Sequence, residues 1–256
     1  MTQSNEESEV SEAEIASHWR DEERINPSPE FVAQANLNDP AVFERFSLEN
    51  FPECFHEYAD LLTWDKRWDT TLDSSEPPFW KWFVGGKLNA SFNCVDRHLE
   101  KFRNKAAFVW VGEPEEERDR VVTYQDLYVR VNEFAALLRD FAGVKTGDRV
   151  TFHMPMAPEL PISMLACARL GAVHSQVFGG FSGNACGDRI VDSGSHVLVT
   201  MDSYWRNGEL LDHKVKADEA VEQAEKSNAK VDEVLVWRRY PEKYSSPTPM
   251  VEGRDY

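Results

Sequence analysis

The alternation of apolar and polar positions between residues 108 and 237 predicts strands and helices in turn along the chain. Residues 172–178 are a valine-rich run, typical of a strand covered on both faces, and the glycines after it break the strand. The apolar run 162–170 predicts a helix that Gly171 ends, and Ser182 is placed to cap the next helix. Strands that alternate with helices imply a parallel-rich sheet with crossover helices, which is the α/β class.

The same pattern continues on both sides of this stretch. Thr123 and Asp126 form a capping-box pattern that predicts the start of a long helix. We expect further strands over residues 108–111, 121–122, 149–153, 196–200 and 234–237, a polar loop over 201–209 and a helix over 210–226.

The chain before residue 96 has a different character. Residues 1–30 are acidic, rich in serine and glutamate, and poor in apolar residues, which predicts a flexible tail. Residues 38–82 are dense in aromatic residues, some of them at helical spacing, which predicts a mainly helical segment whose rings pack together. We therefore expect a tail over 1–30, an aromatic-rich extension over 31–95 and an α/β domain over 96–256.

The net charge of the chain indicates which classes of partner it can bind. The formal net charge is −17, with 45 acidic against 28 basic residues, and arginine outnumbers lysine 17 to 11. An acidic, lysine-poor surface argues against nucleic acid as a partner. It is typical of a halophilic protein, because repulsion between charges is screened over about 3 Å at 1 M salt. An ordinary acidic cytosolic protein is the alternative, and we favour the halophile.

Several kinds of site and location are disfavoured by the residues. The four cysteines, Cys54, Cys94, Cys167 and Cys186, share no spacing typical of a zinc or redox site. No apolar run reaches membrane-spanning length and no basic-then-apolar leader opens the chain, so we expect a cytoplasmic protein without a membrane partner. The common hydrolase and dinucleotide motifs do not occur, so no residue is nominated as catalytic or as a metal ligand.

Gly85-Gly86-Lys87 suggests a phosphate-binding loop at first sight. Lys81 stands where the first glycine of that motif should be, and Leu88 replaces the hydroxyl residue that would meet Mg²⁺. We expect these glycines to form a tight turn instead.

Two loops have the right position for a ligand, because a parallel sheet binds ligands beyond the carboxyl ends of its strands. Residues 178–182 follow one strand and lead into a helix start, and residues 202–209 follow the next strand and carry Arg206. From spacing alone, the glycines could equally supply only turn geometry, and Arg206 could pair with a surface carboxylate.

Three stretches resemble the AMP-forming acetyl-CoA synthetases of the adenylate-forming superfamily. They are WFVGGKLNASFNCVDRHLEKFRNKAAFVW (82–110), GVKTGDRVTFHMPM (143–156) and MPMAPELPISMLACARLGAVHSQVFGGFS (154–182), within a resemblance that covers roughly residues 52–239. The resemblance implies that 31–95 is the N-terminal extension of acetyl- and propionyl-CoA synthetases, although His56 stands where that family more often has tryptophan. It also implies that 96–256 is an incomplete AMP-binding α/β domain.

In that family a Phe-Gly-Gly turn and an Arg-x-Gly-Arg loop contact coenzyme A. The resemblance therefore implies a coenzyme A site at six residues, Phe178, Gly179, Gly180, Arg206, Asn207 and Gly208. Glu209 replaces the last arginine of the loop, which puts the strength of phosphate binding in question.

The activity that the resemblance implies is acetate–CoA ligation with ATP and Mg²⁺, through an acetyl-adenylate, with acetate or another short carboxylate as substrate. The Ser/Thr/Gly-rich ATP loop and the catalytic lysine of that family have no counterpart in this sequence. We therefore expect an N-terminal portion that is inactive alone, with the downstream half of such an enzyme as a candidate partner. The alternative is a non-enzymatic remnant, or a module that binds coenzyme A or a partner with the same fold.

Overall fold

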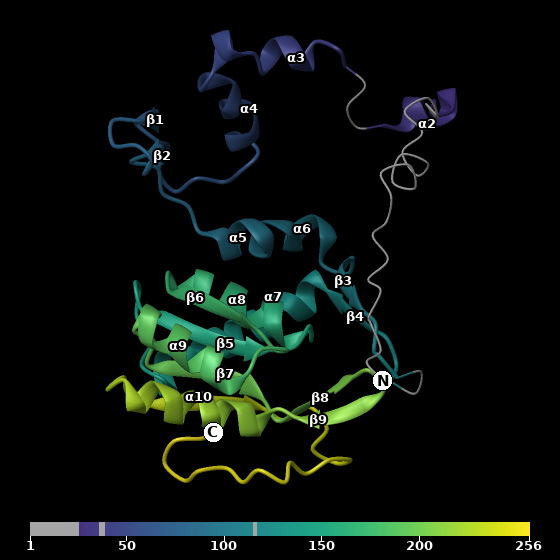
Figure 1. The fold of residues 1–256 in the computed structure, drawn as a ribbon. Coiled ribbons are helices and arrows are strands. Elements are labelled where there is room, and N and C mark those ends of the chain that lie inside the picture. Colours follow the sequence, from purple (N-terminus) through teal and green to yellow (C-terminus); the bar gives the residue numbers. More distant parts are fainter. Residues whose placement is uncertain (1–25, 36–38, 115–116) are drawn as a thin grey trace, which may run out of the picture. The chain divides into compact units, whose positions relative to one another are not determined.

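The computed structural model describes residues 26–35, 39–114 and 117–256 (Figure 1). The chain divides into two compact units between Ala59 and Asp60. The flexible tail predicted for residues 1–30 falls mostly outside the described residues, and Pro29 and Glu30 already belong to a helix.

The first unit consists of short helical segments. They are α2 (Pro29–Gln34), α3 (Val42–Arg45), the 3₁₀ helices η1 (Leu48–Asn50) and η2 (Glu53–Phe55), and α4 (His56–Ala59). The ring of Phe46 lies 5.8 Å from that of Phe55 and 5.3 Å from that of Tyr58, between ring centroids. Aromatic contacts of this kind hold short helices that are too brief to be stable by themselves.

The second unit begins with a hairpin that the aromatic pattern did not predict. Strands β1 (Thr70–Asp73) and β2 (Lys81–Val84) pair antiparallel, followed by α5 (Ala90–Cys94), η3 (Asp96–His98) and α6 (Leu99–Phe102). After β2, Gly85 has a φ of +82°, so the expected tight turn is confirmed. A Cβ at Gly85 would clash with the carboxylate oxygen Oδ2 of Asp69, which lies 2.8 Å from Lys66 Nζ, so the turn packs against an ion pair.

A second hairpin leads into the main domain. Strands β3 (Ala106–Trp110) and β4 (Arg120–Thr123) pair antiparallel, and α7 (Tyr124–Ala136) starts at the predicted capping box. The Asp126 N–H donates to Thr123 Oγ1 at 3.1 Å, and the Thr123 N–H donates to Asp126 Oδ2 at 3.0 Å. The helix ends in a π-helical turn, η4 (Leu137–Phe141).

Four parallel strands form the central sheet in the order β10-β7-β5-β6, which confirms the α/β class. The strands are β5 (Arg149–Met154), β6 (Val173–Phe178), β7 (Val197–Met201) and β10 (Glu233–Trp237). The crossover helices are α8 (Glu159–Leu170), α9 (Gly183–Ser193) and α10 (Lys214–Lys226). Gly171 ends α8 with a φ of +71°, and the Ser182 hydroxyl accepts from the Ala185 N–H at 3.2 Å, both as predicted.

Helices cover both faces of this sheet: α7 and α8 lie on one face, α9 and α10 on the other (Figure 1). Side chains alternate along each strand, so Val197 and Val199 join the core under α7 and α8, while Leu198 joins the core under α9 and α10. The strand predicted over residues 172–178 is confirmed as β6, but the cover predicted on both faces is incomplete, since Val173 is 55% exposed while Val177 is buried; β6 also lies at the edge of the sheet. Valine content indicates a strand but does not say how many neighbours it has.

The polar loop predicted over 201–209 and the helix predicted from residue 210 are wrong. Strands β8 (Ser203–Arg206) and β9 (Glu209–Asp212) form a hairpin, and α10 begins only at Lys214. Asn207 and Gly208 have φ values of 54° and 78° at the turn. Asn-Gly is a strong signal for a two-residue hairpin turn, and the apolar residues after it belong to a strand.

Glycine lets α9 and α10 pack closely. A Cβ at Gly187 would lie 2.6 Å from the Gln223 Cβ and 2.7 Å from the Ala220 carbonyl oxygen. A Cβ at Gly183 would lie 2.5 Å from the Lys216 carbonyl oxygen. Any side chain at these two positions would push the helices apart and open the core beneath them.

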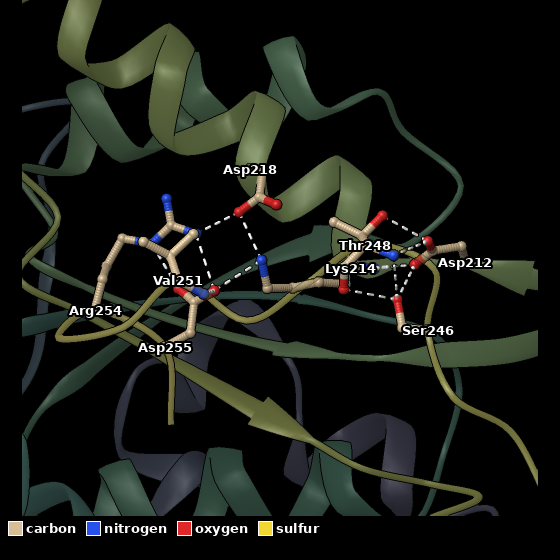
Figure 2. Close-up of polar contacts among 8 residues, drawn as sticks. All are labelled: Asp212, Lys214, Asp218, Ser246, Thr248, Val251, Arg254 and Asp255. Atoms are coloured by element: carbon tan, nitrogen blue, oxygen red, sulfur yellow. Dashed lines mark hydrogen bonds and ion pairs between the residues drawn. The ribbon is translucent and has the colours of Figure 1, made fainter.

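A buried ion cluster ties the start of α10 to the segment after β10 (Figure 2). The fully buried Lys214 ammonium lies 2.6 Å from Asp218 Oδ1 and 2.8 Å from Asp255 Oδ2, and Arg254 contacts both carboxylates. Two cations and two carboxylates therefore neutralise one another, as buried charges require. The same segment extends the sheet, because the Val234 N–H donates to the Arg254 carbonyl at 2.8 Å.

Asp212 fixes the other end of this connection (Figure 2). Its carboxylate accepts from the Lys214 N–H at 3.1 Å and from the hydroxyls of Ser246 and Thr248 at 2.9 Å and 2.6 Å. Asp212 therefore satisfies a free N–H of the first turn of α10 and anchors the chain around Thr248.

Two buried histidines lie between the sheet and the start of α10. His153 of β5 and His213 have ring centroids 4.6 Å apart, and His213 Nε2 lies 3.0 Å from the His153 carbonyl oxygen, to which it donates. Burial lowers the pKa of His153 to about 4 and that of His213 to about 3. Both imidazoles are therefore neutral at pH 7.

We expect this pair to make the fold sensitive to acid. The imidazoles bind protons in the unfolded chain below about pH 6.5 but not in the folded one, so their contribution to stability is complete above that pH. It falls as the pH drops from 6.5 toward 4, by about 1.4 kcal/mol per pH unit for each imidazole. Urea unfolding of wild type and His213→Gln at several pH values, at fixed salt, measures this slope.

The variant should lose about half of the histidine-dependent slope. His196→Gln is the matched control, because His196 is only partly buried. Equal slopes for wild type and His213→Gln would show that His213 is not held neutral by the fold.

Candidate functional site

A cavity of about 290 Å³ opens at the carboxyl ends of the parallel strands. Its walls come from the β3–β4 hairpin, the residues after β5, the turn after β6, strand β8 and residues 239–240. Parallel strands end at the same edge of the sheet, which is why segments so distant in sequence meet here.

Four of the six predicted site residues line this cavity: Phe178, Gly179, Gly180 and Arg206. Asn207 and Gly208 do not line it and form the turn of the β8–β9 hairpin instead. The Gly208 N–H donates to Glu113 Oε1 at 2.7 Å, which ties this turn to the β3–β4 hairpin. Asn207 and Gly208 thus set the position of Arg206 without reaching the cavity.

Glycine is required in the turn after β6. The Phe181 N–H donates to the Phe178 carbonyl at 2.9 Å and closes the turn. A Cβ at Gly179 would lie 2.9 Å from the Pro155 nitrogen, and a Cβ at Gly180 would lie 2.4 Å from Arg206 Nη1. Gly179 therefore allows close packing of the backbone, whereas a side chain at Gly180 would displace the Arg206 guanidinium and the Phe178 ring at the cavity wall.

Arg206 supplies positive charge at the cavity wall. Its guanidinium lies 5.4 Å from the centre of the Phe178 ring, a cation–π distance. None of the described carboxylates forms an ion pair with it. The charge of Arg206 is therefore available to an anionic ligand.

The sequence did not predict the residues of the cavity wall that contains Arg239 and Tyr240. The Arg239 guanidinium lies 4.4 Å from the Trp110 ring and 2.9 Å from Glu117 Oε1, and Tyr240 donates its hydroxyl to the same oxygen at 2.8 Å. Burial, together with this hydrogen bond, raises the pKa of Tyr240. These residues share no spacing in the sequence, so only the fold could bring them together.

The cavity suits binding rather than acid–base chemistry. The rings of Phe178 and Trp110 can contact a planar group, and Arg206 and the Gly180 backbone can contact an anion. Within the described part of the chain, no group of three or more histidine, cysteine, aspartate or glutamate residues could hold a metal ion. Burial raises the pKa of Cys167 and of Cys186 to about 12, so both remain thiols.

No helix among the described residues combines the length and the apolar character needed to cross a membrane.

The chain is similar to known proteins along most of its length. The Pyrobaculum aerophilum acetyl-coenzyme A synthetase is 46% identical over 84% of this chain and 32% of its own length. The Rubrobacter xylanophilus acetyl-coenzyme A synthetase is 43% identical over 90% of this chain and 34% of its own. The Sulfurisphaera tokodaii 3-hydroxypropionyl-coenzyme A synthetase is 43% identical over 91% of this chain and 36% of its own. The chain thus spans about a third of the length of these relatives.

Two family profiles match adjacent parts of the chain. The acetyl-coenzyme A synthetase N-terminus matches residues 42–94, and the AMP-binding enzyme profile matches residues 95–252. The second match includes the whole parallel sheet and every residue that lines the cavity. Because it covers more than half of the sequence, the chain belongs to the AMP-binding enzyme family.

Proposed function

We propose that this chain is the N-terminal portion of an AMP-forming acetate–CoA ligase. Such an enzyme converts ATP, acetate and coenzyme A to acetyl-CoA, AMP and diphosphate through acetyl-adenylate. The observation that carries the proposal is the 40–46% identity to proteins named acetyl-coenzyme A synthetase, over most of this chain. The similarity to a 3-hydroxypropionyl-coenzyme A synthetase keeps another short carboxylate open as the substrate.

On this proposal the cavity holds part of coenzyme A. Phe178, Gly179, Gly180 and Arg206 are the binding residues, and Asn207 and Gly208 keep Arg206 in place through the hairpin turn. Arg206 meets a phosphate of the coenzyme, which a guanidinium with no carboxylate partner is suited to do. Glu209, opposite Arg206 in the hairpin, adds no positive charge.

ATP and Mg²⁺ have a different role from coenzyme A in the proposed reaction. ATP supplies the adenylyl group that activates the carboxylate, and Mg²⁺ offsets the charge of its phosphates. The turn at Gly85 does not fit a triphosphate, because the Asp69–Lys66 ion pair already lies against it. We therefore assign the described cavity to coenzyme A. The alternative of a non-enzymatic binding module is not favoured by relatives that are named as synthetases.

Removal of the Arg206 charge should weaken coenzyme A binding. A hydrogen bond to a charged group contributes about 1.5–3 kcal/mol, so we expect Arg206→Ala to raise the Kd roughly tenfold or more. Isothermal titration of the purified chain with coenzyme A measures the change. Arg130→Ala removes the same charge from the exposed side of α7 and should leave the Kd unchanged. Equal affinity of Arg206→Ala and wild type would remove Arg206 from the site.

We expect the chain by itself not to adenylate acetate, because the triphosphate must be held and its developing charge met by fixed donors or Mg²⁺. The assay is acetate-dependent exchange of pyrophosphate into ATP. It compares residues 1–256 with a chimera in which they replace the matching third of the Pyrobaculum aerophilum relative. The intact relative is the positive control, and the melting temperature reports whether the chimera folds.

Pyrophosphate exchange by the folded chimera, but not by residues 1–256, supports the assignment as an acetate–CoA ligase. Robust exchange by residues 1–256 alone would show that the ATP site lies within them. A folded chimera that binds coenzyme A but shows no exchange would contradict the ligase assignment.

We further propose that the protein acts in the cytoplasm of a halophilic organism. The support is the net charge of −17 and the preference for arginine over lysine. Repulsion between charges reaches about 30 Å at 0.01 M salt but only about 3 Å at 1 M.

The melting temperature should therefore rise steadily as KCl increases from 0.01 M to molar concentration. Choline chloride at equal ionic strength separates screening from specific binding of K⁺ and should give a similar rise. A melting temperature that stays level or falls as the salt rises would exclude the halophile.

A further inference from the structure

The carbonyl oxygen of Gly179 is held by two side chains from different elements. Lys216 Nζ in the first turn of α10 donates to it at 3.0 Å, and the Tyr204 hydroxyl of β8 donates to it at 3.3 Å. Tyr204 is only 5% exposed and its ring packs edge-on against His213, so its hydroxyl is held firmly in place. Two donors on one carbonyl fix the orientation of the peptide that joins Gly179 to Gly180.

That orientation determines where the next N–H points. In a trans peptide the C=O and N–H bonds point in opposite directions, so the Gly180 N–H points away from Lys216 and Tyr204. No described residue accepts a hydrogen bond from this N–H. Gly180 is exposed and lines the cavity beside Arg206. The free donor and the guanidinium are therefore neighbours on one wall.

Lys216 is an unusual residue for its position. A lysine in the first turn of a helix opposes the helix dipole, and the first turn of α10 contains no acidic residue. Lys214 in the same turn is neutralised by two carboxylates, whereas Lys216 forms no ion pair with any described carboxylate. Burial and the nearby Arg206 charge lower the pKa of Lys216. The Glu219 carboxylate offsets part of this effect without forming an ion pair with Lys216, so the fold keeps two positive charges close together.

An ammonium on a carbonyl oxygen also polarises the peptide. Hydrogen-bonded groups strengthen one another when they are linked in a chain, so the Gly180 N–H becomes a better donor while Lys216 is charged. A free backbone donor beside a cation is a common way to bind a phosphate oxygen.

We propose that Lys216 and Tyr204 are positioning residues, which hold the Gly179–Gly180 peptide so that its N–H binds a phosphate of coenzyme A together with Arg206. This inference rests on the proposed function for its ligand. In this chain Glu209 replaces the second arginine of the hairpin loop. The inference assigns the second positive charge of the site to Lys216 instead, which lies on helix α10.

The first test is titration of the full 256-residue chain with coenzyme A. Lys216→Met should raise the Kd about fivefold or more, Tyr204→Phe should raise it about two- to threefold, and Lys216→Arg should stay within about twofold of wild type. Lys226→Met, which removes a 60% exposed lysine from the far end of α10, should not change the Kd. The loss in Lys216→Met should shrink as KCl rises, because screening weakens the phosphate contact in wild type.

The second test observes the donor itself. The chain has 13 glycines, so labelling with ¹⁵N-glycine gives a simple amide spectrum, in which Gly180→Ser identifies the Gly180 signal. Coenzyme A should move this signal in wild type and much less in Lys216→Met. The Gly171 amide, which donates to the Ala168 carbonyl before the amino end of β6 and so lies at the opposite edge of the sheet from the cavity, is the internal control and should stay in place.

The outcomes separate this inference from the proposed function. If wild type binds coenzyme A and both Lys216→Met and Tyr204→Phe bind it equally well, the positioning role is wrong and the proposed function stands. If Lys216→Arg binds as poorly as Lys216→Met, the charge is not what matters and the inference is also wrong. If wild type itself does not bind coenzyme A, the proposed coenzyme site fails. Should Lys216→Met not fold, the Gly180 signal in Tyr204→Phe decides, and an unaltered response contradicts the inference.

Discussion

The parallel pairing of β5 with both β6 and β7 is the constraint on which the rest of the structure depends. Because these strands run in the same direction, the segments that leave them meet at one edge and form the cavity. A shift of β6 by one residue would turn the buried Val177 outward and move the glycine turn away from Arg206. The site therefore depends on strand register more than on any single contact within it.

Sequence patterns predicted the regular parts of this fold because those parts follow local rules. The capping box at Thr123, the helix end at Gly171 and the cap at Ser182 each depend on residues close in sequence. The β8–β9 hairpin was missed although Asn-Gly indicated it, because the apolar residues after the turn also suit a helix. Strand order, which makes β6 an edge, depends on pairing between distant segments and leaves no local signal.

The residues of the candidate site also fall into those that the sequence could indicate and those that only the fold brings together. Phe178, Gly179, Gly180 and Arg206 could be named from the resemblance, because they lie in two short motifs. Trp110 ends one of the stretches that carry the resemblance but had no predicted role, Arg239 and Lys216 lie in no quoted stretch, and the neighbours of all three are set only by the folded chain. Beneath the turn, His153 and His213 remain neutral because burial lowers their pKa, and the Lys216 charge close by lowers it further. The electrostatics of the site thus involve residues that contact no ligand.

The Lys214 cluster has a consequence for how this protein can change during evolution. Loss of Lys214 alone would leave the carboxylates of Asp218 and Asp255 with Arg254 as their one common cation. Loss of either carboxylate would leave a buried positive charge in excess. Loss of a single partner of the fully buried Lys214–Asp255 pair is therefore costly, whereas replacement of both by apolar residues is often neutral. These positions are therefore expected to change together more readily than one at a time, which slows mutational drift on this side of α10.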